Sequence, residues 1–186
     1  MELEIRRLTP DLAEDYLRFF DRTPHDDQAD EHKCYCVCWC GEDCTGDYES
    51  KYLSSRERRR DHARQCIQRG SLQGYLAYFG GQAVGWCNAN TKSDCLRCYS
   101  WRRYMDYVPV EDAGSGIKAK SIFCFVVPPE MRRKGIATQL LKRVCEDAAQ
   151  EGFRFAEAYP YQESGGHASD FGGYVEMFEK NGFHIS

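Results

Sequence analysis

The sequence predicts a single domain, residues 1–186, of the α+β class, and three stretches carry that prediction. Ile122 to Val127 is a run of apolar and β-branched residues, typical of a strand buried on both faces. From Ile136 to Ala148, apolar residues recur every four positions, as they do along one face of an amphipathic helix. Tyr75 to Ala89 holds two strand-like runs around Gly80-Gly81, which is the pattern of a β-hairpin. A chain of 186 residues is long enough to bury one hydrophobic core.

The N-terminal part predicts a strand followed by two helices. Leu3 to Leu8 alternates partly between apolar and polar residues, as a half-buried strand does. Thr9-Pro10-Asp11 supplies an N-cap residue, a proline for the first helical position and a first-turn acid, so a helix follows. Ser54 to Glu57 has the pattern of a capping box and opens a second helix that runs to about Arg69. Gly70 then ends this helix.

The chain contains eleven cysteines, which is an unusually large number, and a polar loop from Asp21 to Ser50 is rich in them. Its cysteines are Cys34, Cys36, Cys38, Cys40 and Cys44. Alternate spacing would place the first four on one side of an extended segment, either as a soft-metal site or as a cysteine-rich wall of a binding pocket. Structural zinc sites usually use pairs separated by two to four residues, so we favour the wall of reduced thiols and expect no metal. Cys95 and Cys98 have the spacing of half a zinc site, but alone this is a weak signal, and we favour a local disulfide or no role for the pair.

The remaining segments predict one more strand and two short helices. Thr91 to Lys120 has no clean period, although a short helix fits Leu96 to Tyr104. Three aromatic residues of this region either form a lid over a bound molecule or simply pack inside a long insertion; they are Trp101, Tyr104 and Tyr107. Phe153 to Tyr159 predicts a buried strand, and Gly173 to Lys180 predicts a short helix.

The turn between the strand at Val127 and the helix at Ile136 predicts an anion-binding site. The first N–H groups of a helix have no intrahelical partner, and the helix dipole favours negative charge beside them. Arg132-Arg133-Lys134 adds positive charge, and Gly135 lets the backbone approach a phosphate closely. The turn matches neither a Walker loop nor a dinucleotide-binding glycine motif.

Two motifs resemble those of the GNAT superfamily of acetyl-CoA-dependent N-acetyltransferases. Arg132-x-x-Gly135-x-Ala137 matches the family's R/Q-x-x-G-x-G/A signature, and Phe178 to Phe183 is similar to its Y-E-K-x-G-F sequence. The resemblance implies the three-layer GNAT fold, in which helices flank a central mixed, mostly antiparallel, splayed sheet. It also implies that acetyl-CoA donates an acetyl group to a primary amine of a small molecule or peptide, by direct attack in a ternary complex.

By the same resemblance, two nearby stretches and one later residue contact the cosubstrate. Backbone groups of three residues would meet the pantetheine arm, and an N–H among them would serve the oxyanion; these are Phe125, Val126 and Val127. The pyrophosphate would lie on the turn and the first helical residues, with Phe178 also beside the cofactor. The turn residues are Arg132, Arg133, Lys134, Gly135, Ile136, Ala137 and Thr138.

The chain departs from the family at both proton-transfer positions. Ser121 stands where some members carry a glutamate base, and Phe178 stands where many carry a tyrosine acid. Glu157, with Tyr159 on the same face of its strand, is the best candidate base, the alternative being a surface or salt-bridged carboxylate. Tyr174, one helical turn before Phe178, is the candidate acid. His167, Asp170 or a water molecule are the other candidates for the base.

These departures keep two other functions open. One is a non-catalytic sensor that binds acyl-CoA, and the other is a cysteine-rich metal or redox protein on the same scaffold. A net charge of −4 argues against nucleic acid as a partner. Because the sequence contains no long apolar run and no signal-peptide pattern, we expect no membrane association and a cytoplasmic location.

The C-terminal end carries a prediction about the sheet edge. Family members usually close with a β-hairpin whose last strand lies beside the strand that is Phe153 to Tyr159 here. The sequence stops at Ser186, too soon for that strand. We expect a truncated chain first, and second a homodimer that covers the open edge.

Overall fold

The computed structural model describes residues 2–25, 27–42, 47–105, 108, 118–160 and 171–185. Its centre is a five-stranded sheet with the strand order β1-β2-β3-β4-β5. The strands are β1 Glu4–Arg7, β2 Gly74–Phe79, β3 Gln82–Thr91, β4 Ala119–Val126 and β5 Phe155–Ala158. Neighbours from β1 to β4 pair antiparallel, whereas β5 runs parallel to β4. The predicted mixed, mostly antiparallel sheet is therefore confirmed.

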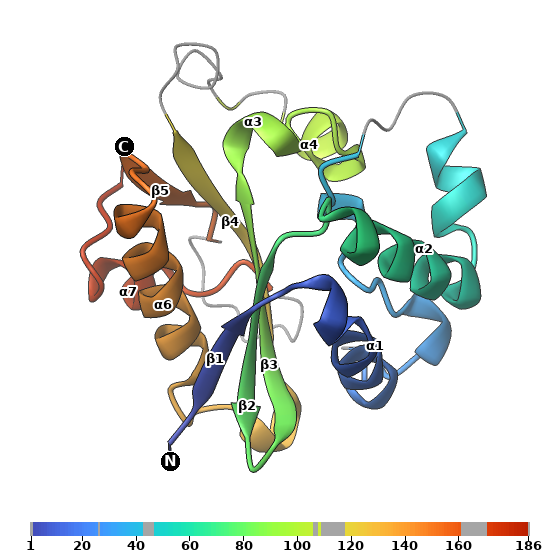
Figure 1. Ribbon diagram of the computed structural model, residues 1–186, viewed down its shortest axis with the longest axis horizontal. Coiled ribbons are helices and arrows are strands. Elements are labelled where there is room, and N and C mark those ends of the chain that lie inside the picture. The colour runs from blue at the N-terminus through green and yellow to red at the C-terminus, as the bar shows by residue number, and fades with distance from the viewer. Residues whose placement is uncertain are drawn as a thin grey trace.

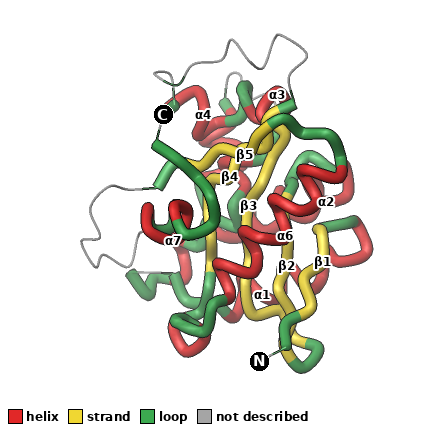
Figure 2. The backbone as a smooth tube through the Cα atoms, turned by 90° about the vertical axis from the view of Figure 1, so that its left-hand side faces the viewer, coloured by secondary structure: helices red, strands yellow, loops and turns green. Residues whose placement is uncertain are grey.

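Helices cover both faces of the sheet and make three layers (Figure 1). The helices are α1 Ala13–Arg22, α2 Arg56–Arg69, α3 Lys92–Cys95, α4 Tyr99–Tyr104, α6 Ile136–Gln150 and α7 Val175–Glu179. Short 3₁₀ turns are η1 Pro10–Leu12, η2 Asp30–His32, η3 Val37–Trp39 and η5 Pro129–Met131, and η4 Glu49–Leu53 is a π turn. Figure 2 looks onto the face that carries α6 and α7. No helix in these described ranges combines the length and apolar composition needed to cross a membrane.

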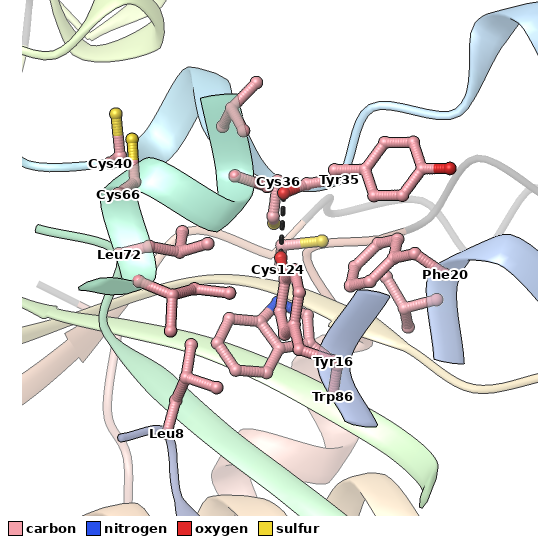
Figure 3. Packing of buried hydrophobic residues seen from close by; sticks show 14 of the residues in the cluster. Leu8, Tyr16, Phe20, Tyr35, Cys36, Cys40, Cys66, Leu72, Trp86 and Cys124 are labelled. Carbon is pink, nitrogen blue, oxygen red and sulfur yellow. Dashed lines mark hydrogen bonds between the residues drawn. The ribbon is translucent and has the colours of Figure 1, made fainter. Parts of the chain in front are cut away.

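The helix layers cover the middle of the sheet on both faces, as the contacts of β3 show, and the neighbouring β4 is buried along its whole length. On one face, α6 packs through Ile136 and Leu140 so closely that a Cβ atom at Gly85 would lie 2.6 Å from Ile136 Cγ2. On the other face, α1 brings Tyr16 against Trp86, with ring centroids 4.8 Å apart (Figure 3). A strand covered on both sides needs apolar residues at every position rather than at alternate ones.

Two details differ from the sequence-based expectations. The N-cap of α2 is Ser55, whose side chain accepts a hydrogen bond from the amide of Arg58 at 3.3 Å. Ser54 has helical backbone angles and so cannot be the cap. With Ser55 as the cap, the third helical residue is Arg58 and not Glu57, so the predicted capping box is wrong, although a serine does cap the helix. The helix predicted from Leu96 to Tyr104 begins only at Tyr99, as α4, because 96–98 form a turn; a further short helix, α3, precedes that turn.

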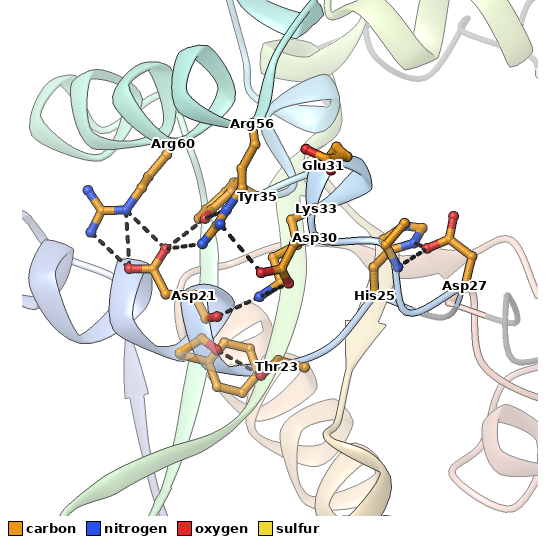
Figure 4. Close-up of polar contacts among 12 residues, drawn as sticks. Asp21, Thr23, His25, Asp27, Asp30, Glu31, Lys33, Tyr35, Arg56 and Arg60 are labelled. Carbon is orange, nitrogen blue, oxygen red and sulfur yellow. Dashed lines mark hydrogen bonds and ion pairs between the residues drawn. The ribbon is translucent and has the colours of Figure 1, made fainter.

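An ion-pair cluster ties the cysteine-rich loop to α1 and α2 (Figure 4). Asp21, in the last turn of α1, accepts hydrogen bonds from Arg60 Nη2 at 2.9 Å and from the Tyr35 hydroxyl at 2.7 Å. Burial opposes the charged form of Asp21, but the hydrogen bonds from Arg60 and Tyr35 prevail and lower its pKa. Three segments that are distant in sequence therefore meet at one carboxylate.

The sheet splays beside β5, as the family resemblance implies. β4 and β5 pair only from Ala119 to Ile122, and a register shift between Asn88 and Ala89 bends the β3–β4 pair nearby. Beyond Ile122, the amide of Phe125 donates instead to the carbonyl of Phe171 at 2.6 Å. The second half of β4 is thus separated from β5, and a cleft opens there.

Candidate active site

A cleft of about 1790 Å³ lies where β4 and β5 separate. The cysteine-rich loop forms one wall, the ends of β4 and β5 form its floor, and the C-terminal segment forms the other wall. The lining residues used below are Cys34, Cys36, Cys38, Trp39, Lys92, Phe123, Cys124, Glu157, Tyr159, Phe171, Gly172 and Phe178. The cleft is large enough for an acceptor together with part of a cosubstrate.

Glu157 presents a carboxylate to this cleft from β5. It lies opposite Ser121 in the β4–β5 register, and the Ser121 hydroxyl donates a hydrogen bond to its Oε1. Its Oε2 accepts from Lys92 Nζ at 3.0 Å. Ser121 is the position at which, by the resemblance given above, some GNAT members carry a glutamate base, and the carboxylate of Glu157 lies beside it from the adjacent strand. The predicted base and the position of the missing one therefore come together.

Lys92 is the residue of this group that sequence reasoning missed. It opens α3, and only 3% of its side chain is exposed. A buried ammonium needs an opposite charge, and the ion pair with Glu157 supplies it. The ion pair therefore fixes the orientation of the carboxylate, and Lys92 is a positioning residue. A lysine in a segment without periodicity gave no signal that it would be buried.

Aromatic side chains form a continuous surface beside Glu157. Trp39 stacks on Phe123 with centroids 4.2 Å apart, and Phe123 stacks on Tyr159 at 5.7 Å. Trp101 packs edge-on against Phe123 and Tyr159 and is buried, so for this residue packing is the correct interpretation rather than a lid. Tyr104 is exposed, and Tyr107 lies outside the described residues.

The hydroxyl of Tyr159 is a buried polar group at the edge of this surface. It has no hydrogen-bond partner in the described part of the chain. Burial, with a contribution from the charge of Glu157, raises its pKa, so it remains protonated and can act as a donor.

The cysteine-rich loop does not adopt the extended conformation that alternate spacing predicts. Tyr35 and Cys36 have φ of 47° and 52°, and η3 follows, so the chain turns tightly. Cys34, Cys36 and Cys38 still line the cleft, whereas Cys40 faces α2. The predicted wall is therefore confirmed for three thiols and wrong for the fourth. Cys44 lies outside the described residues.

The thiols of this wall are poor nucleophiles. Burial raises the pKa of Cys38 to about 12. A hydrogen bond with Cys124, together with burial, raises the pKa of Cys36. Because the thiolate is the reactive form, neither side chain is suited to carry an acetyl group.

The turn from Arg132 to Ala137, called the signature turn below, has the geometry of an anion site. Gly135 is the N-cap of α6 with φ of 76°, and an added Cβ there would meet no atom within 4 Å. The first α6 hydrogen bond runs from the amide of Gln139 to the carbonyl of Gly135, so the amides of 136–138 have no intrahelical acceptor. Arg132 Nε donates to the carbonyl of Val127 at 3.1 Å and ties the turn to the end of β4. Residues 132–135 of the turn are exposed, so its basic side chains can reach a phosphate.

The comparisons with known proteins identify the family. The model of the acetyltransferase (GNAT) family matches residues 5–183. The chain belongs to this family. No curated protein matches the chain.

Solved structures with the same fold are N-acetyltransferases of low sequence identity. A ribosomal-protein-alanine N-acetyltransferase from Brucella melitensis biovar Abortus 2308 has 12% identity and a TM-score of 0.56, covering 100% of this chain and 94% of that one. An aminoglycoside acetyltransferase from an uncultured soil metagenomic sample has 16% identity and a TM-score of 0.57, with the same coverage. A predicted acetyltransferase with acetyl-CoA from Clostridium acetobutylicum has 14% identity and a TM-score of 0.52, covering 100% and 92%. At these identities the similarity concerns the fold.

In the second GNAT motif, Phe178 takes the place of the family's tyrosine and packs as an apolar side chain. Phe178 is buried in α7, packed against Phe125 and Phe183 with centroids 6.1 and 5.2 Å away, and it lines the cleft. Tyr174 is the N-cap of α7, with 49% of its surface exposed, and it is not among the described residues that line the cleft. The structure therefore does not bring Tyr174 together with Glu157. His167 and Asp170 lie outside the described residues.

Proposed function

We propose that this GNAT family member transfers an acetyl group from acetyl-CoA to a primary amine of a small molecule or peptide. The observation that carries the proposal is the Glu157 carboxylate, which Ser121 and Lys92 orient. It faces a cleft that is also lined by β4, the strand before the signature turn. A cleft in which the Glu157 carboxylate lies beside an aromatic surface suits an organic ammonium, because the carboxylate and the ring faces both attract cations.

The signature turn would hold the pyrophosphate of acetyl-CoA. Amides of Ile136, Ala137 and Thr138 would donate to its oxygens, while Arg132, Arg133 and Lys134 would add charge from the exposed side. The pantetheine arm would run along β4 from Val127 towards Phe125. Phe171 accepts the Phe125 amide, so the amide of Val127, which faces the same side by the two-residue period, is our candidate donor to the oxyanion.

Glu157 would act as the general base of a direct transfer. It takes a proton from the acceptor ammonium, directly or through water, and the free amine attacks the thioester carbonyl. The C–N bond forms, the carbonyl oxygen becomes an oxyanion, and the C–S bond then breaks. The leaving thiolate takes a proton, for which Tyr174 and Tyr159 are the candidate donors, and the positively charged nitrogen then gives up its second proton, directly or through water, to restore that donor and leave a neutral amide. The protonated thiols of Cys36 and Cys38 support direct attack over a cysteine-bound intermediate.

Turnover over a panel of amines, followed as release of free CoA thiol, tests the proposal. We expect Glu157→Gln to lower kcat by about 10²-fold or more while the affinity for acetyl-CoA is retained. Glu146→Gln, an exposed carboxylate on the outer face of α6, is the matched control and should leave kcat unchanged. Unaltered kcat in Glu157→Gln would remove this residue from the mechanism.

The alternative function is a non-catalytic acyl-CoA sensor, which is favoured by Ser121 and Phe178 at the two positions of the family's proton-transfer residues. The same assay separates this sensor from an enzyme. A sensor would bind acetyl-CoA at the signature turn and release no CoA with any amine. A cytoplasmic location and the absence of nucleic-acid and membrane partners stay predictions.

A further inference from the structure

A buried group of four metal-ligand side chains lies outside the cleft, between the cysteine-rich loop and α2. Its members are Cys40, Glu42, His62 and Cys66. One ligand atom from each lies within 4.8 Å of all the others. The sulfur atoms of Cys40 and Cys66 lie side by side in Figure 3. Cys40, His62 and Cys66 are buried, and Glu42 is partly buried.

We propose that these four residues bind one zinc ion, which fastens the cysteine-rich loop to α2. This goes beyond acetyl transfer, and it reverses the expectation of no metal, which rested on the spacing of Cys34 to Cys44 alone. The set that the structure assembles contains only one of those loop cysteines. Its other thiol and its imidazole come from α2.

The distances between the ligand atoms suit a tetrahedral ion. His62 Nε2 lies 3.4 Å from Cys66 Sγ and 3.5 Å from Glu42 Oε2. Typical zinc bond lengths place such neighbours about 3.6 Å apart for nitrogen and sulfur, and about 3.3 Å for nitrogen and oxygen. His62 and Cys66 stand at positions i and i+4 of one helix, so their side chains share a face. The protein thus needs only small side-chain movements to close around the ion.

Charge balance also favours a divalent cation here. Two thiolates and a carboxylate would carry three negative charges, which Zn²⁺ and Arg69 together neutralise. Arg69 Nη2 already pairs with Glu42 Oε1 and lies 3.9 Å from Cys66 Sγ.

The surroundings orient the ligands as a metal site requires. Tyr52 stacks on the His62 ring at 4.0 Å, and Ser71 donates to Glu42 at 3.2 Å. The Tyr48 hydroxyl lies 3.2 Å from Cys40 Sγ and 2.9 Å from His62 Nε2. When Nε2 binds the ion, that hydroxyl is left to interact with the sulfur and with the carbonyl of Val37, 3.1 Å away. Two soft thiolates, an imidazole and a carboxylate favour zinc over magnesium or calcium, and four protein ligands make the site structural.

Metal content of protein purified without chelator tests the proposal directly. We expect about one zinc per chain, and a loss of most of it in Cys40→Ala and Cys66→Ala. Cys145→Ala, a partly buried thiol of α6 outside the group, is the control and should keep its zinc. Because the readout is metal and not turnover, its result is independent of the proposed acetyl transfer.

Titration of stripped wild-type protein with Co²⁺ keeps the test decisive if the cysteine variants do not fold. We expect a thiolate-to-cobalt absorption band that saturates at about one equivalent, and binding at least about tenfold weaker in Glu42→Gln. Cobalt binding without that band, zinc-free protein that takes up no metal, or a Cys40–Cys66 disulfide in the mass spectrum of unreduced protein would each overturn the proposal.

Discussion

The signature turn and the cleft beside β5 build their sites in different ways. The turn uses backbone amides, one glycine and basic side chains that lie within one stretch, 132–138. The cleft uses side chains from distant segments, with Glu157 meeting Ser121 across 36 positions and Lys92 across 65. A phosphate needs many equivalent donors, which a helix N-terminus supplies locally. A proton transfer needs one group in one orientation, and this depends on how distant elements pack.

The largest effect is expected at the signature turn, because a phosphate bound by backbone amides should be sensitive to any side chain added there. Gly135→Asp adds a side chain in a left-handed conformation and a negative charge where the phosphate approaches. We expect the affinity for acetyl-CoA, measured by calorimetry, to fall by about 10²-fold or more. Gly152→Asp, at the other end of α6 with φ of 74° and equally open space, is the matched control for strain. If both variants bind acetyl-CoA normally, the turn is not the pyrophosphate site.

A smaller effect is expected from the two candidate acids, Tyr159 beside Glu157 and Tyr174 at the N-cap of α7. The Tyr174 variant tests whether α7 takes part in the chemistry. If Tyr174 protonates the leaving thiolate, Tyr174→Phe lowers kcat by about tenfold and leaves the acidic limb of the pH–rate profile unmoved. Tyr159→Phe is the paired variant. It removes a buried hydroxyl without a described partner, so we expect a higher melting temperature together with a higher KM for the amine. A wild-type kcat in Tyr174→Phe would leave the acid role to Tyr159 or water.

The pairing of distant segments also predicts a pH-dependent stability at Asp21. Its pKa is lower in the folded protein than the ordinary value of about 3.9, so its contribution to stability is fully present above that value. The contribution is lost as the pH falls through the lower, folded-state pKa. Asp21→Asn should cost about 1–2 kcal/mol near neutral pH and flatten the acid side of the stability curve. Urea unfolding at several pH values measures this; parallel curves for wild type and variant would contradict it.

The smallest effect concerns the edge of β5 that does not pair with β4. In the described sheet β5 pairs with β4 alone, and the predicted homodimer would form on its other edge. If so, sedimentation at micromolar concentration shows dimers, and Phe155→Lys weakens them several-fold, because a charged edge opposes strand pairing. Phe79→Lys, an exposed phenylalanine at the end of β2, is the control. A wild-type monomer at all concentrations would exclude the dimer.

The sequence alone determined the elements whose causes are local. The buried strand, the glycine turn and the amphipathic helix that follow one another from Ile122 to Gln150 are fixed by residue types and spacing over short distances. The β2–β3 hairpin follows from Gly80-Gly81 for the same reason. The two GNAT motifs lie on such elements, so the family and the anion site could be predicted together.

Only the tertiary structure decided which side chains meet. Glu157 faces Ser121 because of the β4–β5 register, and a shift by one residue would turn it to the other face. Cys40 does not line the cleft with the other loop cysteines, because the chain turns at Tyr35 and Cys36, which have positive φ. Its sulfur lies near His62 and Cys66 instead. The His62-x-x-x-Cys66 spacing was visible in the sequence, but its partners were not. Long-range packing chooses partners, and no pattern within a single segment encodes that choice.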